Sequence, residues 1–124
     1  MNDIRVKRVY DPPAPDDGAR ILVDRLWPRG LGRDSAALTL WLQDVAPSAA
    51  LRRWFGHDPG RWEEFRDRYR RELERNASAV GRLDAFLRDG PVTLLFAARD
   101  ERHNHARVLA EFMAGEATDR VTAP

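Results

Sequence analysis

The stretch Val92-Thr93-Leu94-Leu95-Phe96-Ala97-Ala98 carries the clearest structural signal in the chain. It is an almost continuous apolar run of strand length, and Asp89-Gly90-Pro91 directly before it ends any preceding helix. A run of this length and composition predicts a strand that is buried on both faces, as in a parallel sheet. The rest of the chain must then supply the neighbouring strands and the helices that cover them.

Two segments near the N-terminus are predicted to join the same sheet. Residues 4–9 alternate apolar and cationic side chains, which is typical of a strand with one buried face. Residues 20–24 have a continuously apolar centre, which suits a strand buried on both faces. Between them, residues 11–18 contain three prolines and a final glycine, which exclude regular structure there.

Three helical segments are predicted between the second and third strands. The first covers Ala36 to Asp44, and the second follows Ser48, whose hydroxyl is suited to capping it. The third follows Asp58 and is long, with Gly81 as a position that bends or splits it. Its apolar residues recur at helical spacing on one face, and we expect them to be buried: Trp62, Phe65, Tyr69, Leu73, Val80, Leu83 and Leu87.

The chain ends with one more predicted helix, from about Glu101 to Ala114, capped by Asp100 and stopped by Gly115. Residues 116–124 have little to bury and are expected to fray. The order of strands and helices therefore predicts one small α/β domain over residues 1–115, with a short, mainly parallel sheet flanked by helices.

Composition narrows the classes of function. The 124 residues include no cysteine, which excludes disulfides, thiolate metal sites and cysteine nucleophiles. No apolar run approaches the roughly 20 residues that span a bilayer, and the charged N-terminus has no signal-type segment, so we expect a cytoplasmic protein without a membrane partner. The formal net charge of +1 does not favour nucleic-acid binding. Oligomeric state is left open.

Arginine dominates the cationic residues. Of the 21 lysines and arginines, Lys7 is the only lysine and 20 are arginines. A coding bias explains such a preference, but guanidinium groups are also well suited to bidentate contacts with oxyanions. Several of them therefore become candidates for lining a binding site.

Ligands of open α/β sheets bind at the carboxyl ends of the strands, close to helix N-termini. Asp24, Arg25 and Arg29 follow the second predicted strand, and Arg99 follows the third. Because parallel strands end at one edge of a sheet, we expect these side chains to lie close together, along with the residues that open the last helix: His103, Asn104 and His105.

The favoured interpretation is a pocket for a small anionic molecule. Arg25, Arg29 and Arg99 supply positive charge, and His103 and Asn104 stand beside a helix N-terminus that favours anions. The chain has no glycine-rich phosphate loop, no Walker lysine and no Gly-x-Gly-x-x-Gly motif, so nucleotide binding of the common kinds is not expected, and neither is a cofactor.

If the protein is an enzyme, the sequence favours acid–base or hydrolytic chemistry on that anion. Asp24 ends a buried strand, where desolvation raises a carboxylate pKa, so it is the candidate base, with His105 or His57 as the acid. The alternative for Asp24 is a structural carboxylate that ties the sheet to its arginine-rich rim. The alternative for the whole protein is a non-catalytic accessory or regulatory module that binds nucleic acid or protein.

A metal site is not expected. His103 and His105 are two positions apart, which places them about 200° apart around a helix, so both bind one ion only in an extended turn.

Several stretches of the chain resemble the YeaO-like branch of domain-of-unknown-function family 488. They are Lys7-Arg8-Val9-Tyr10-Asp11, the run from Leu22 to Gly30, Trp54-Phe55-Gly56-His57, and the run from Leu94 to Asp100 with His103-Asn104-His105-Ala106. The resemblance covers residues 4–113 in one register. It implies a small bacterial α/β protein with no assigned activity. Other branches carry a cysteine and a histidine after the last strand, and this chain has no cysteine to match them.

Overall fold

Four parallel strands form one sheet in the computed structural model, which describes residues 3–122 and, in its last helix, side chains up to Gly115. The strand order is β1-β4-β2-β3. The strands are β1 (Ile4–Arg8), β2 (Ala19–Leu22), β3 (Leu40–Trp41) and β4 (Val92–Phe96). The three predicted strands are confirmed, and β4 lies between two others because β1 and β2 each pair with it along their length.

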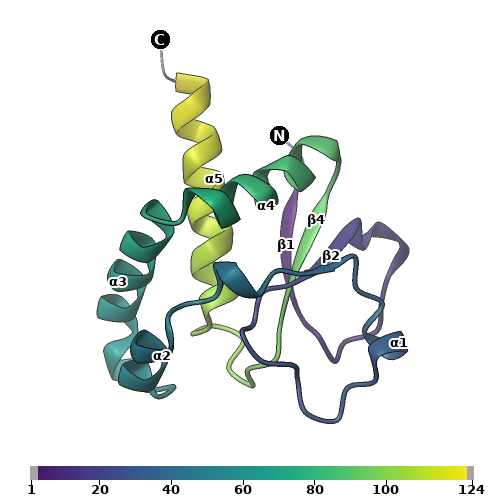
Figure 1. The fold of residues 1–124 in the computed structure, drawn as a ribbon, viewed down its shortest axis with the longest axis horizontal. Helices are drawn as coiled ribbons and strands as arrows, with labels where there is room; N and C mark the ends of the chain where they lie inside the picture. The colour runs from purple at the N-terminus through teal and green to yellow at the C-terminus, as the bar shows by residue number, and fades with distance from the viewer. Residues whose placement is uncertain (1–2, 123–124) are drawn as a thin grey trace.

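Different elements cover the two faces of the sheet. Alternate residues of the strands point to opposite faces, so Ile21 and Leu94 join a large core while Leu22 and Leu95 join a small one. The large core is closed by α2 (Ala49–Phe55), α3 (Trp62–Glu74), α4 (Ala77–Asp89) and α5 (His105–Thr122). Figure 1 shows these helices on one side of the strands, with α1 (Arg33–Ala36) and long loops on the other.

The predicted helix over Ala36–Asp44 is wrong. Helix α1 ends at Ala36; the next residue, Ala37, has a left-handed backbone (φ 48°), and the chain then extends as β3. The amide of Thr39 donates to the Arg20 carbonyl (2.8 Å), and the amide of Leu42 donates to the Leu22 carbonyl (2.9 Å). The conformation of residues 39–42 is therefore determined by their hydrogen bonds to the edge of β2, and not by the helix-like spacing of their apolar residues.

The long apolar stripe is carried by two helices instead of one. Helix α3 ends at Glu74 and α4 begins at Ala77, so the break is at residues 75–76 and not at Gly81, which lies inside α4. Asn76 leaves helical geometry, and its side-chain amide donates to the Asp44 carbonyl (2.7 Å). The predicted burial is confirmed for the first helix, where Phe65, Tyr69 and Leu73 are buried and Trp62 is half-buried.

The last helix begins later and ends later than predicted. Helix α5 starts at His105 and is capped by Asn104, whose side-chain oxygen accepts from the Arg107 amide (3.1 Å). Asp100 instead caps the turn before the helix. The helix continues past Gly115 to Thr122, because a glycine costs a helix only about 1 kcal/mol and does not have to end it. The predicted fraying of residues 116–124 stays a prediction, since residues 123–124 lie outside the described residues.

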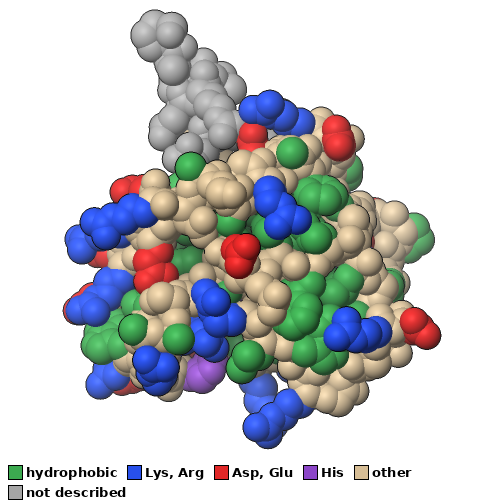
Figure 2. Space-filling model, in the orientation of Figure 1, with side chains coloured by type: hydrophobic (Ala, Val, Ile, Leu, Met, Phe, Trp, Pro, Cys, Tyr) green, Lys and Arg blue, Asp and Glu red, His purple; other side chains and the backbone are tan. Residues whose placement is uncertain are grey.

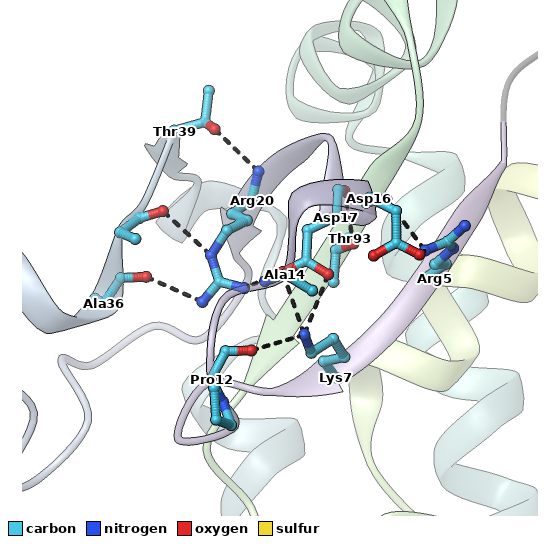
Figure 3. Close-up of polar contacts among 11 residues, drawn as sticks. Arg5, Lys7, Pro12, Ala14, Asp16, Asp17, Arg20, Ala36, Thr39 and Thr93 are labelled. Carbon is cyan, nitrogen blue, oxygen red and sulfur yellow. Dashed lines mark hydrogen bonds and ion pairs between the residues drawn. The ribbon is translucent and has the colours of Figure 1, made fainter.

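A buried cationic network crosses the small-core face of the sheet (Figure 3). Asp17, in the 3-10 turn Pro15–Asp17, is 3% exposed and accepts hydrogen bonds from Lys7 (3.1 Å) and Arg20 (2.5 Å). Arg20 also donates to the carbonyls of Ala36 and Ala37. Burial raises the pKa of Asp17, but the hydrogen bonds from Ala14, Lys7 and Arg20 outweigh it, so the pKa is lowered overall. We call these residues the Asp17 network.

None of the helices in the described part of the chain combines the length and the apolar character needed to cross a membrane.

Candidate functional site

A cleft of about 920 Å³ lies beyond the carboxyl ends of β1, β2 and β4. Its lining includes all the residues that the sequence analysis singled out: Asp24, Arg25, Arg29, His57, Arg99, His103, Asn104 and His105. Figure 2 shows a histidine surface at the lower edge of the molecule with Lys or Arg side chains on either side of it. The expected convergence of the strand ends is therefore present.

Pairing beyond the strands brings these residues together. The amide of Val23 donates to the Leu95 carbonyl (3.1 Å), and the amide of Ala97 donates to Oδ2 of Asp24 (3.0 Å). Asp24 thus joins the end of β2 to the end of β4. The residues that follow the two strands therefore line the same cleft. The β2 side is fixed further by Trp41, whose indole Nε1 donates to the Asp24 carbonyl (2.8 Å).

The cleft is also lined by residues that were not among the predicted site residues, including Arg8 at the end of β1, Tyr10 just beyond it, and Arg52 and Arg53 on α2. Arg8 and Tyr10 lie at the end of a predicted strand and could have been included by the same rule. Arg52 and Arg53 lie on a helix whose position over the sheet edge is set by the large core, through Leu51 and Phe55. No local signal marks them.

The cleft is strongly cationic. Among the described residues, its lining contains six arginines but only one carboxylate, Asp24. The arginines are Arg8, Arg25, Arg29, Arg52, Arg53 and Arg99.

Most of these arginines have no partner. The guanidinium of Arg8 donates to the carbonyls of Ala97 and Ala98. Among the described residues, the other five guanidinium groups take part in no hydrogen bond and no ion pair. In Arg25 and Arg52 the Nε atom is buried and lacks a hydrogen-bond partner, as it does in Arg66 and Arg70 on α3, whose terminal nitrogens pair with Glu111. In Arg25 and Arg52 the terminal nitrogens have no partner among the described residues either, so no contact within the fold offsets the cost of burying the unpaired group.

Asp24 and His105 form the polar floor of the cleft. Nε2 of His105 lies 3.0 Å from the Val23 carbonyl and 3.2 Å from Oδ1 of Asp24. A carbonyl oxygen only accepts, so Nε2 carries a proton and donates to Val23. The contact with Oδ1 has the distance of an ion pair but not the geometry of a hydrogen bond, and Oδ1 has no hydrogen-bond partner among the described residues. Both side chains are therefore held by backbone groups.

The turn that precedes α5 is stabilised by its own polar contacts. Asp100 accepts from the amides of Arg102 and His103 (2.9 Å each) and contacts Nδ1 of His103 (2.9 Å). These contacts lower the pKa of Asp100 to about 2, and the backbone hydrogen bond from His103 makes the largest contribution. Asn104 donates to the Asp100 carbonyl and caps α5, so its amide is engaged in the turn.

The three histidines line the same cleft but make different contacts. His103 contacts Asp100, His105 contacts the floor of the cleft, and His57 is exposed on a left-handed backbone (φ 56°) next to the Phe55 ring. No group of three or more potential ligand side chains that could hold a metal ion occurs among the described residues.

The fold and the cleft define a small parallel α/β protein with a cationic cleft at one edge of its sheet. The chain belongs to the family DUF488-N3i, described as the inactive DUF488-N3 subclade, which it matches over residues 3–123. It is 44% identical to an uncharacterized protein of Mycobacterium tuberculosis over 112 residues, covering 90% of this chain and 94% of the relative. It is 41% identical to the uncharacterized protein YeaO of Escherichia coli over 111 residues, covering 90% and 96%. No solved structure matches the chain.

The family relationship expected from the sequence is thereby confirmed. It assigns no ligand and no reaction to the cleft, so the roles of the lining residues stay predictions.

Proposed function

We propose that the cleft binds a small anionic molecule and does not transform it. The observation that carries this proposal is the set of five unpaired arginines, of which Arg25 and Arg52 each bury an Nε atom without a partner. Several guanidinium groups that share a cleft repel one another. A ligand with bidentate oxyanion groups offsets that repulsion and supplies the missing acceptors.

Two further observations favour binding over chemistry. Backbone groups anchor both side chains, since Oδ2 of Asp24 accepts from the Ala97 amide and Nε2 of His105 donates to the Val23 carbonyl, and this anchoring suits the structural interpretation of Asp24. The family that the chain matches is also described as inactive. Catalysis by Asp24, with His105 or His57 as acid, stays a prediction, and its test is Asp24→Asn in any assay that detects turnover.

The proposal is tested by a thermal-shift screen of the whole chain with phosphate, pyrophosphate, sulfate and small carboxylates. A ligand at 100 times its Kd stabilises the folded state by about 2.7 kcal/mol, which is readily detected as a rise in Tm. Arg25→Met keeps the apolar stem of the side chain and removes the charge, and it is expected to abolish the rise.

Arg71→Met is the matched control, because Arg71 lies on α3 outside the cleft and its loss changes the net charge equally. The proposal fails if no anion raises Tm, or if both variants weaken binding to the same extent. The alternative of nucleic-acid binding is tested in the same series. Affinity for a duplex that falls steeply with salt, without any small-anion binding, would replace the proposal with that alternative.

A further inference from the structure

Two large hydrophobic side chains are exposed in the described part of the chain, and both line the cleft. Leu26 is 68% exposed and Tyr10 is 42% exposed. Single exposed apolar residues are common on protein surfaces and need no explanation. Here, however, the two occur together at the edge of the same cationic cleft, while the other large hydrophobic side chains described are at least partly buried.

The Tyr10 side chain and the loop that carries Leu26 are held in place by their surroundings. The hydroxyl of Tyr10 donates to the Arg29 carbonyl (2.8 Å), and the guanidinium of Arg8 lies over its ring at 5.0 Å. The polar end of Tyr10 and one face of its ring are therefore occupied, and the rest of the ring is left to contact a ligand. The loop that carries Leu26 is fixed on one side by the bond from Trp41 to Asp24 and on the other by the bond from Trp27 Nε1 to the Leu31 carbonyl (2.8 Å).

The cleft thus offers two kinds of contact at once: unpaired guanidinium groups for oxyanions, and a preformed apolar edge. A bare inorganic anion uses only the first. The volume of about 920 Å³ is also at the upper end of the range for small-molecule sites, far more than one phosphate fills.

Building on the proposed function, we infer that the ligand is a nucleotide, with its phosphate on the arginines and its planar base against Tyr10 and Leu26. Aromatic rings and apolar side chains stabilise bases by stacking with little sequence preference. Recognition through arginine side chains also agrees with the absence of a glycine-rich phosphate loop from the chain.

The inference is tested by calorimetric titration of the whole chain with four probes: AMP, UMP, ribose 5-phosphate and adenosine. AMP and UMP are expected to bind about tenfold more tightly than ribose 5-phosphate, because stacking of the base adds to the phosphate contacts. Adenosine, which lacks the anion, is expected to bind weakly. A 5′-phosphorylated oligonucleotide is titrated in parallel, to determine whether the natural ligand is a free nucleotide or the end of a nucleic-acid strand. Selective binding of either one supports the inference.

Leu26→Asn provides the decisive variant, because an exposed side chain can be replaced without loss of the core. It is expected to weaken AMP binding several-fold and to leave ribose 5-phosphate binding unchanged, whereas Arg25→Met is expected to weaken both. Equal affinity for AMP and ribose 5-phosphate, unaffected by Leu26→Asn, overturns this inference and leaves the proposed function intact. If none of the phosphates binds, both fail.

Discussion

Two regions of the molecule bring cationic side chains together: the Asp17 network on the small-core face of the sheet, and the cleft beyond the carboxyl ends of the strands. In the network, Lys7 and Arg20 share one buried carboxylate, and Arg20 also donates to the carbonyls of Ala36 and Ala37. In the cleft, five arginines have neither a carboxylate nor a carbonyl partner among the described residues, and the one carboxylate present contacts a histidine and a backbone amide.

The difference separates arginines that hold the fold from arginines that are available to a ligand. A cation whose donors are all satisfied has no capacity left for binding, and removing its partner leaves an uncompensated buried charge. A cation without a partner contributes little to the fold and can be neutralised only by something from outside. The same residue type therefore has opposite consequences in the two regions, and substitutions in each region test this.

The largest effect is expected in the Asp17 network. Asp17→Asn removes the charge that Lys7 and Arg20 share, and breaking a buried ion pair in this way costs about 3–5 kcal/mol of the free energy of unfolding. Urea unfolding followed by circular dichroism measures the loss. Asp16→Asn is the matched control, because Asp16 is exposed and pairs only with Arg5, and it is expected to change stability little. Equal effects of the two substitutions would contradict the structural role of the network.

The next effect is expected where the cleft meets the sheet. Asp24→Ala leaves the Ala97 amide without its acceptor, which costs about 1–3 kcal/mol in the free energy of unfolding. Asp24→Asn keeps an oxygen for that amide and is expected to cost less. If Asp24→Ala unfolds at the same urea concentration as the unchanged chain, Asp24 does not tie β2 to β4.

A smaller effect, visible only in acid, is expected at the turn before α5. The pKa of Asp100 is about 2 in the folded protein and near 3.8 without its contacts, so its ionised form stabilises the fold. Because the folded pKa is the lower one, this contribution is present above about pH 4 and is lost as the pH falls towards 2. The stability difference between the unchanged chain and Asp100→Ala, measured by thermal unfolding at a series of pH values, should therefore narrow from pH 4 to pH 2. A difference independent of pH would contradict this interpretation.

The smallest effect is expected in the cleft itself. Arg25→Met and Arg52→Met remove guanidinium groups that have no partner, so each is expected to change the free energy of unfolding by no more than about 0.5 kcal/mol, or to raise it slightly. A loss of stability comparable to that of Asp17→Asn would show that the cleft arginines support the fold, and the distinction between the two regions would disappear.

The sequence by itself determined three of the strands and the edge of the sheet where the candidate site lies. The apolar run at β4 and the alternating and apolar segments at β1 and β2 were sufficient, because strand patterns of this kind are local and strong. The parallel order followed from the intervening helices, and parallel strands end on one edge. Asp24, Arg25, Arg29 and Arg99 were therefore placed together from the sequence alone.

Tertiary contacts decided the rest. Residues 36–44 have helical spacing, yet the free edge of β2 offered hydrogen bonds that a strand satisfied. Arg52 and Arg53 line the cleft because packing in the large core sets the position of α2. The sequence around them contains no pattern that predicts this position. The difference between paired and unpaired arginines depends on which carboxylates lie within reach, as Asp17 does for Arg20. That is a property of distances between segments far apart in the chain, and local sequence patterns do not carry it.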